Sequence, residues 1–149
     1  MIAEGKANQA VKLLTVMRTK ESLDIVREDI WNRNEPTGVS FIAAIMLGAS
    51  GDSTVREYLI KSINSQQHSL EEKDRNRAIV ALAAIGEQEQ IEQVRGLLAT
   101  GALGPTDGML MFATRGCSIH FPTAEARVIA WLDDIEKPSN ASPYTHPIN

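Results

Sequence analysis

The single cysteine of the chain lies close to a histidine in one short loop. Cys117 precedes His120 by three residues in the stretch R-G-C-S-I-H-F-P over residues 115–122. Thiolate and imidazole groups can bind zinc or act as a nucleophile and its base. Zinc sites need three or four protein ligands, and the other histidines, His68 and His146, are predicted in a polar turn and in the tail. We therefore keep Cys117 and His120 as weak metal candidates, predict no catalytic residue and no cofactor, and expect a buried Cys117.

A second set of candidate residues is basic or aromatic and lies on the second helices of successive predicted helix pairs. These residues are Arg56, Tyr58, Lys61, Arg95, Arg127 and Trp131. We predict that this set binds a partner, since aromatic residues dominate the hot spots of protein interfaces. Glu57, Glu92 and Glu125 interleave with the basic residues, which is also typical of a salt-bridged, solvent-exposed surface. Trp131, like Trp31, also fits core packing or capping near an end of the helical array.

Length and composition are those of one globular domain. The chain has 149 residues, of which 43% are hydrophobic and 23% charged. Its formal net charge of −4 does not favour a general affinity for nucleic acid or anionic membranes. The first residues lack the apolar core of a signal peptide, and no apolar run approaches the roughly 20 residues of a membrane span. We therefore expect no membrane partner. One cysteine cannot form an internal disulfide, so we expect a cytoplasmic protein.

Apolar residues recur at helical spacing along almost the whole chain, and the alternating pattern of strands is hard to find. The expected helical segments are 10–17, 22–31, 39–47, 52–63, 69–85, 91–98, 109–112 and 123–135. The segment 39–47 is apolar almost all round but too short for a bilayer, which predicts a buried helix. Residues 1–137 are expected to form a single all-α domain. The Pro-rich residues 138–149 are expected to form an extended or disordered tail.

Residue types at the starts of these segments predict how three helices begin. Asp52 or Ser53 can cap the helix that follows by accepting hydrogen bonds from its free N–H groups, and Thr123 can cap the last helix. The stretch Ser69-Leu-Glu-Glu72 has the pattern of a capping box, in which Glu72 is the third helical residue.

The two middle helix pairs are similar in sequence. Residues 42–63 and 80–98 each contain an Ala-rich helix that ends at a glycine (Gly48 and Gly86), a short polar turn and an amphipathic helix. Small residues allow neighbouring helices to approach closely, and glycine permits the sharp turn. The spacing of about 36–38 residues lies near the period of helical solenoid repeats.

This pattern resembles HEAT-like repeats, most closely over residues 44–63 and 78–98. The resemblance implies a short α-α superhelix of about four antiparallel helix pairs, with the second helices lining a concave, ligand-facing surface. HEAT-like DNA-repair glycosylases use such a groove for nucleic acid. An irregular helical bundle is the alternative architecture.

These observations favour a non-enzymatic adaptor or regulatory module that binds another protein through a helix-lined surface. An enzyme or ligand-binding protein that uses the Cys117/His120 loop is one alternative. A HEAT-like nucleic-acid binder is another, which the interleaved acidic residues disfavour. A short solenoid exposes the apolar ends of its helical array. A homo-oligomer that covers these ends is therefore a further option for the partner.

Overall fold

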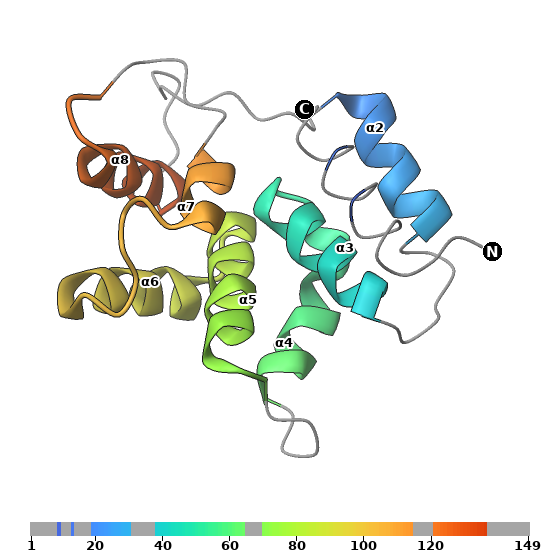
Figure 1. The fold of residues 1–149 in the computed structure, drawn as a ribbon, viewed down its shortest axis with the longest axis horizontal. Coiled ribbons are helices and arrows are strands. Elements are labelled where there is room, and N and C mark those ends of the chain that lie inside the picture. The colour runs from blue at the N-terminus through green and yellow to red at the C-terminus, as the bar shows by residue number, and fades with distance from the viewer. Residues whose placement is uncertain are drawn as a thin grey trace.

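The described part of the chain is all-helical. A computed structural model describes residues 19–30, 38–64, 70–114 and 121–136, together with Gln9 and Leu13. Helices and turns account for these residues and no strand occurs among them, which confirms the predicted all-α class (Figure 1). The elements are α2 (Lys20–Ile25), the π-helical turn Val26–Ile30, α3 (Gly38–Ala49), the 3-10 turn Ser53–Val55, α4 (Arg56–Asn64), α5 (Glu72–Ile85), α6 (Gln88–Thr100), α7 (Gly108–Ala113) and α8 (Ala124–Glu136).

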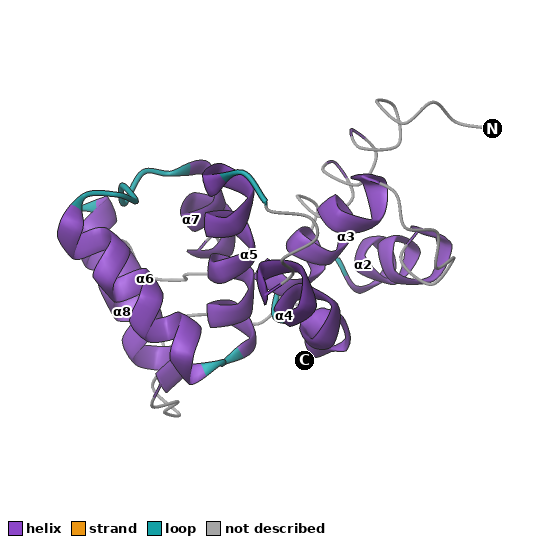
Figure 2. Ribbon diagram, turned by 90° about the horizontal axis from the view of Figure 1, so that it is seen from below, coloured by secondary structure: helices purple, strands orange, loops and turns teal. Residues whose placement is uncertain are grey.

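Helix α5 lies at the centre of the molecule. It packs against α3 and α4 on one side and against α6, α7 and α8 on the other (Figures 1 and 2). Residues 78–83 of α5 are buried without interruption, because neighbouring helices cover every face of this segment. Helix α7 also contacts α3, and α6 contacts α8. This packing is compatible with a bundle or with a superhelix, and the HEAT-like repeat stays a prediction.

Helices α3 and α5 approach each other closely at a glycine. A β-carbon built on Gly48 would lie 3.0 Å from Cδ1 of Leu59 and 3.1 Å from Cβ of Ala81. Leu59 and Ala81 are both fully buried, so neither has free space to retreat into. The helix predicted over 39–47 is confirmed, and its residues 43–47 are buried, while Phe41 and Ile42 are half-buried.

Two of the predicted helix ends are confirmed by their hydrogen bonds. Gly86 ends α5 with a φ of 106°, a left-handed conformation that glycine adopts without strain. The N–H of Glu87 donates to the carbonyl of Leu82 over 3.1 Å, as in a Schellman motif. At the start of α8, the N–H of Ala126 donates to Oγ1 of Thr123 over 3.0 Å.

One predicted boundary is wrong. Helix α5 begins at Glu72, with Glu71 as its N-cap residue, so Glu72 is the first helical residue and not the third. Leu70 packs against the core ahead of the helix, and the first-turn carboxylates Glu72 and Asp74 interact favourably with the helix dipole in place of a side-chain cap. The predicted helical segment 22–31 is helical through Ile30, and after Ile25 the α-helix continues as a π-helical turn.

Some predictions fall outside the described residues. These are the segment 10–17 apart from Leu13, the residues Trp31 and Ser69, and the tail 138–149. Among the described helices, none combines the length and the apolar character that a membrane-spanning helix requires.

An ion pair connects the π-helical turn to the chain that follows α3. The Nε of Arg27 donates to Oδ2 of Asp52 over 2.7 Å, and its Nη1 donates to Asp24 over 2.8 Å. Only 4% of the Asp52 side chain is exposed. Its other oxygen accepts hydrogen bonds from the N–H and the hydroxyl of Thr54, which confirms the predicted cap at Asp52. The two carboxylates favour the charged guanidinium and raise the pKa of Arg27, against the opposing effect of its partial burial.

Replacing two glycines by alanine should give opposite results. Gly96 lies on an exposed position of α6, and a β-carbon added there would have no other atom within 4 Å, so Gly96→Ala should stabilise the fold by about 0.5–1 kcal/mol. Gly48→Ala gains the same helix propensity, but its methyl group is forced against Ala81. We therefore expect the free energy of unfolding to fall by about 1 kcal/mol. Urea unfolding of both variants measures the difference. Equal stabilisation would show that α3 and α5 are not in close contact.

Arg27→Met should destabilise the protein by about 1–3 kcal/mol, because it leaves the carboxylate of Asp52 buried without its cation. Arg77→Met is the matched control. Arg77 pairs with Asp74 over 3.4 Å, and both side chains are more than a third exposed, so its loss should change stability by less than about 0.5 kcal/mol. Thermal unfolding compares the two variants. Equal losses of stability in the two variants would show that the Arg27–Asp52 ion pair does not stabilise the fold.

Candidate functional site

The predicted partner-binding arginines on α4 and α6 are held by carboxylates of the same molecule. Arg56 of α4 forms an ion pair with Glu87, which precedes α6, and its Nη2 donates to Oε2 of Glu87 over 3.2 Å. This hydrogen bond raises the pKa of Arg56. The Nη2 of Arg95 on α6 donates to Asp133 over 2.9 Å and to Glu136 over 3.0 Å, both on α8. Arg56 therefore joins α4 to the residue before α6, and Arg95 joins α6 to α8.

The other predicted residues differ in their surroundings. Lys61 is exposed on α4. Tyr58 is half-buried and packs against the core, and this burial raises the pKa of its hydroxyl. Arg127 is half-buried on α8. Trp131 is a core residue with only 6% of its surface exposed, in line with the packing alternative for this residue. The structure thus does not gather the set into one exposed patch, and its role in partner binding stays a prediction.

The loop with Cys117 and His120 lies outside the described residues, so the burial of Cys117 stays a prediction as well. Within the ranges that the structure describes, no group of three or more histidine, cysteine, aspartate or glutamate side chains is placed to hold a metal ion.

Two adjoining cavities follow one side of α5 and share the residues Lys73, Arg77 and Asp107. The first has a volume of about 490 Å³, and its remaining lining residues are Ile42, Ile45, Met46, Gly108, Met109 and Phe112. The second has a volume of about 380 Å³, and its remaining lining residues are Glu72, Asn76, Ala102 and Leu103. We call the two together the α5 groove, the first cavity its apolar end and the second its polar end.

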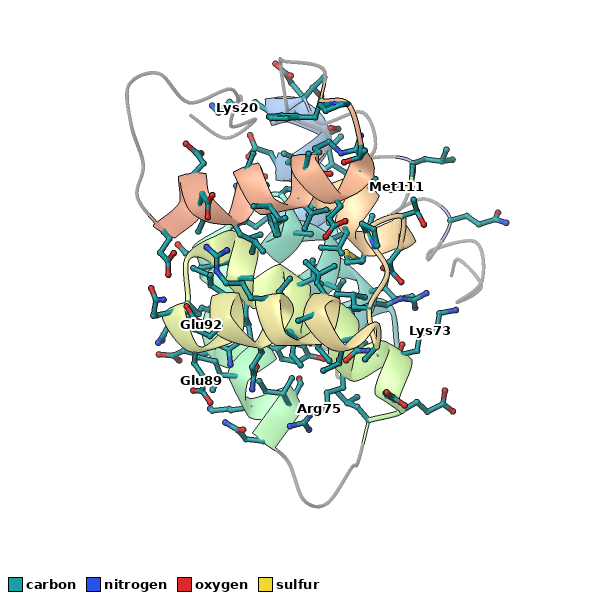
Figure 3. The ribbon with its side chains drawn as sticks, turned by 90° about the vertical axis from the view of Figure 1, so that its left-hand side faces the viewer. Lys20, Lys73, Arg75, Glu89, Glu92 and Met111 are labelled. Atoms are coloured by element: carbon teal, nitrogen blue, oxygen red, sulfur yellow. The ribbon has the colours of Figure 1, made fainter. Side chains whose placement is uncertain are left out.

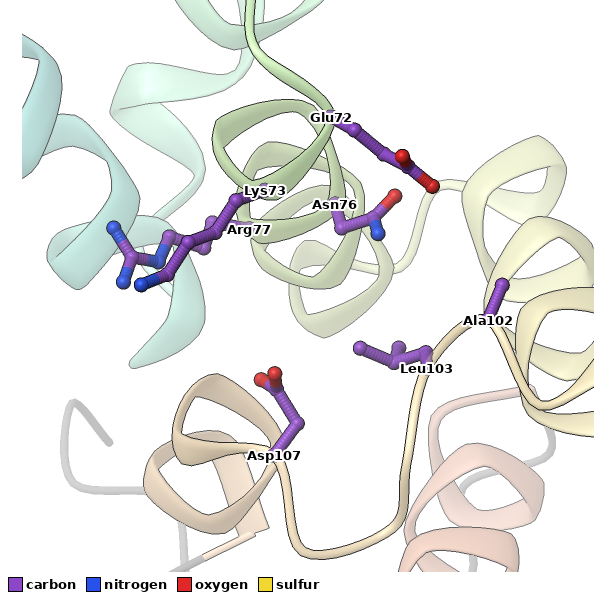
Figure 4. A pocket seen from close by; sticks show the side chains of 7 residues that line it. All are labelled: Glu72, Lys73, Asn76, Arg77, Ala102, Leu103 and Asp107. Atoms are coloured by element: carbon purple, nitrogen blue, oxygen red, sulfur yellow. The ribbon is translucent and has the colours of Figure 1, made fainter.

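The groove forms where three helices and one loop meet. Helix α3 contributes Ile42, Ile45 and Met46, while α7 contributes Met109 and Phe112. The polar side chains come from the first two turns of α5, and the loop between α6 and α7 closes the polar end. Figure 4 shows Lys73 and Arg77 extending together from α5, with Asp107 facing the opening from the start of α7.

The charges that line the groove are not paired with one another. The described ion pairs include none between Asp107 and either Lys73 or Arg77. Asp107 instead caps α7, since its Oδ1 accepts a hydrogen bond from the N–H of Met109 over 2.9 Å. Lys73 is exposed, and Arg77 has only the long contact to Asp74. Figure 3 places Lys73 on the opposite side of the molecule from Glu89 and Glu92 of α6.

Sequence reasoning missed this groove. The carboxylates Glu71, Glu72 and Asp74 are typical of a helix start and a solvated face, although the same stretch also holds the two cations. The sequence feature that could have indicated the groove is the spacing of Lys73 and Arg77, which places two like charges on one face of a helix. The opposite wall of the groove, around Asp107, lies about thirty residues further along the chain, and no local pattern links it to α5.

Comparison with known protein families, with curated proteins and with solved structures finds no match to this chain.

The contacts of Glu136 make the stability of the α6–α8 contact depend on pH. Its carboxylate accepts a hydrogen bond from Nε2 of Gln88 over 2.8 Å and another from Arg95, and these bonds lower its pKa. Because the folded pKa lies below the unfolded one, the stabilisation is present above the unfolded pKa of about 4.3 and is lost as the pH falls through the folded pKa.

Glu136→Gln should therefore lower the free energy of unfolding at neutral pH, and its difference from the wild type should shrink on acidification. Asp134→Asn on the same helix is the control, since Asp134 has no described ion pair. Urea unfolding at pH 7 and below pH 4 checks this. A difference that stays constant with pH would contradict the assigned role of Glu136.

Proposed function

We propose that this protein binds another protein through the α5 groove and acts as an adaptor or regulatory module, without chemistry of its own. The observation that carries the proposal is the continuity of the apolar end with a polar end that holds two cations free of close ion pairs. Recognition sites of this kind combine apolar anchoring with a few oriented polar groups.

The shape of the groove supports a polypeptide partner. The two cavities extend from α3 past α5 to the loop after α6, which suits an elongated segment better than a compact molecule. Met46 and Met109 line the apolar end, and methionine side chains adjust their shape to different apolar partners at low cost. In this proposal the protein is cytoplasmic, as the single cysteine predicts.

The two alternatives have less support among the described residues. A nucleic-acid binder needs cations that can reach phosphates, whereas Arg56 and Arg95 already pair with carboxylates. An enzyme or ligand-binding protein would use the Cys117/His120 loop, for which thiol labelling and metal analysis are the direct tests.

Met109→Gln should weaken partner binding about tenfold, because burial of a methionine side chain contributes roughly 1.5–3 kcal/mol. The matched control is Met111→Gln on the same short helix, since Met111 is 49% exposed and does not line the groove. Affinity capture from the native cell extract, quantified by mass spectrometry, compares the two variants with the wild type. Circular dichroism verifies that both remain folded.

Equal capture by the wild type and Met109→Gln would rule out the groove. In that case a combined variant of Arg56, Tyr58 and Arg95 tests the surface of the second helices. Loss of capture in that variant alone would assign binding to the residues that the sequence suggested.

A further inference from the structure

Charges of both signs line the junction between the two cavities of the α5 groove. Lys73, Arg77 and Asp107 line both cavities, so a segment that extends from the apolar end to the polar end passes close to all three. The two cations come from α5, whereas Asp107 comes from the start of α7 on the opposite wall (Figure 4). Glu72 adds a second carboxylate at the polar end. The lining therefore holds two cations and two carboxylates, and its charge is balanced.

These charges are only partly compensated within the molecule. Arg77 has a 3.4 Å contact to Asp74, and both side chains are more than a third exposed. Among the described residues, no ion pair involves Lys73, Glu72 or Asp107. All three of these residues are exposed, so water solvates their charges while the groove is empty.

The balanced lining restricts the charge that an occupant can carry. An occupant that displaces water from the groove removes solvation from these charges, which costs free energy unless each charge gains a partner. A segment with carboxylates alone would place them beside Asp107 and Glu72. A segment with cations alone would place them beside Lys73 and Arg77. An uncharged segment would leave both walls without a counter-charge, so a segment that carries both signs fits the groove best.

We propose that the partner presents an extended segment in which an acidic and a basic residue adjoin bulky apolar residues. The apolar side chains enter the apolar end, the carboxylate contacts Lys73 and Arg77, and the cation contacts Asp107. This inference rests on the proposed function and adds the chemistry of its partner. Successive side chains of an extended chain point to opposite sides, so neighbouring acidic and basic residues reach the α5 wall and the α7 wall. The guanidinium of Arg77 can hold a carboxylate through two hydrogen bonds.

The test begins with selection of peptides from a random display library on the immobilised full chain. Fluorescence anisotropy then measures the binding of the selected peptides, labelled with fluorescein. We expect an acidic residue next to a basic one, beside leucine, phenylalanine or methionine. Asp107→Asn and Lys73→Gln/Arg77→Gln each remove the charge of one wall and should weaken binding by about three- to tenfold. Asparagine is also a good N-cap residue, so Asp107→Asn preserves the start of α7.

Matching substitutions in the peptide identify which charges meet. Replacing the acidic residue of the peptide by its amide should weaken binding to the wild type, with little further effect in Lys73→Gln/Arg77→Gln. Replacing the basic residue by glutamine should lose its effect in Asp107→Asn instead. A change in net charge alone does not produce such pairwise coupling. Lys20→Gln and Glu89→Gln, at exposed residues outside the groove, are the controls and should bind the peptides like the wild type.

Selected peptides with charges of one sign, or with none, would overturn the mixed-charge segment. Absence of any selected peptide would do the same, as would coupling of the acidic peptide residue to Asp107. Each of these results leaves the proposed function intact if capture from extract still depends on Met109, whereas capture independent of Met109 rules out the groove itself. A concentration-dependent dimer that Met109→Gln converts to a monomer would identify a second copy of this chain as the occupant, against our inference.

Discussion

The close contact between α3 and α5 at Gly48 is the constraint on which the rest of the structure depends. A β-carbon at residue 48 would press against Leu59 at 3.0 Å and Ala81 at 3.1 Å, so a glycine at this position favours the close approach of the two helices. Once α5 is held against α3, its buried segment 78–83 offers surfaces to α4, α6, α7 and α8. Dense packing around one helix propagates any displacement of that helix to all its neighbours.

The same arrangement produces the α5 groove. Gly48 lies near the C-terminal end of α3, and Ile42, Ile45 and Met46 of the same helix line the groove. Helix α7 contacts both α3 and α5, so its residues Met109 and Phe112 complete the apolar end. Ile42 and Met109 are half-buried at this hollow, while Ile45, Met46 and Phe112 are buried, and the two partly uncovered side chains are the physical basis for proposing a binding partner there.

Ion pairs decide which charged residues remain available at the surface. Arg56 and Arg95 have the residue type of an interface hot spot, yet Arg56 pairs with Glu87 before α6 and Arg95 pairs with Asp133 on α8. In the sequence, Lys73 and Arg77 resemble ordinary solvated charges. In the structure they line an apolar cavity, and Arg77 has one long contact to a carboxylate, that of Asp74. Exposed ion pairs contribute little to stability, but they do reduce the positive potential that a partner encounters.

The sequence by itself determined the local features of this protein. Helical periodicity, the apolar character of 39–47, the glycine at 86 and the caps at Asp52 and Thr123 follow from preferences that act within a few residues. The start of α5 could not be predicted in this way, because the packing of Leu70 on the core competes with the capping box.

Only the tertiary structure decided the groove and the pairing of the arginines. Lys73 lies on α5 and Asp107 at the start of α7, and the tertiary fold brings these distant segments of the chain together. Whether an arginine is paired depends on which carboxylate a neighbouring helix presents. These features arise from the packing of several helices at once, and a single sequence carries no local pattern for that packing.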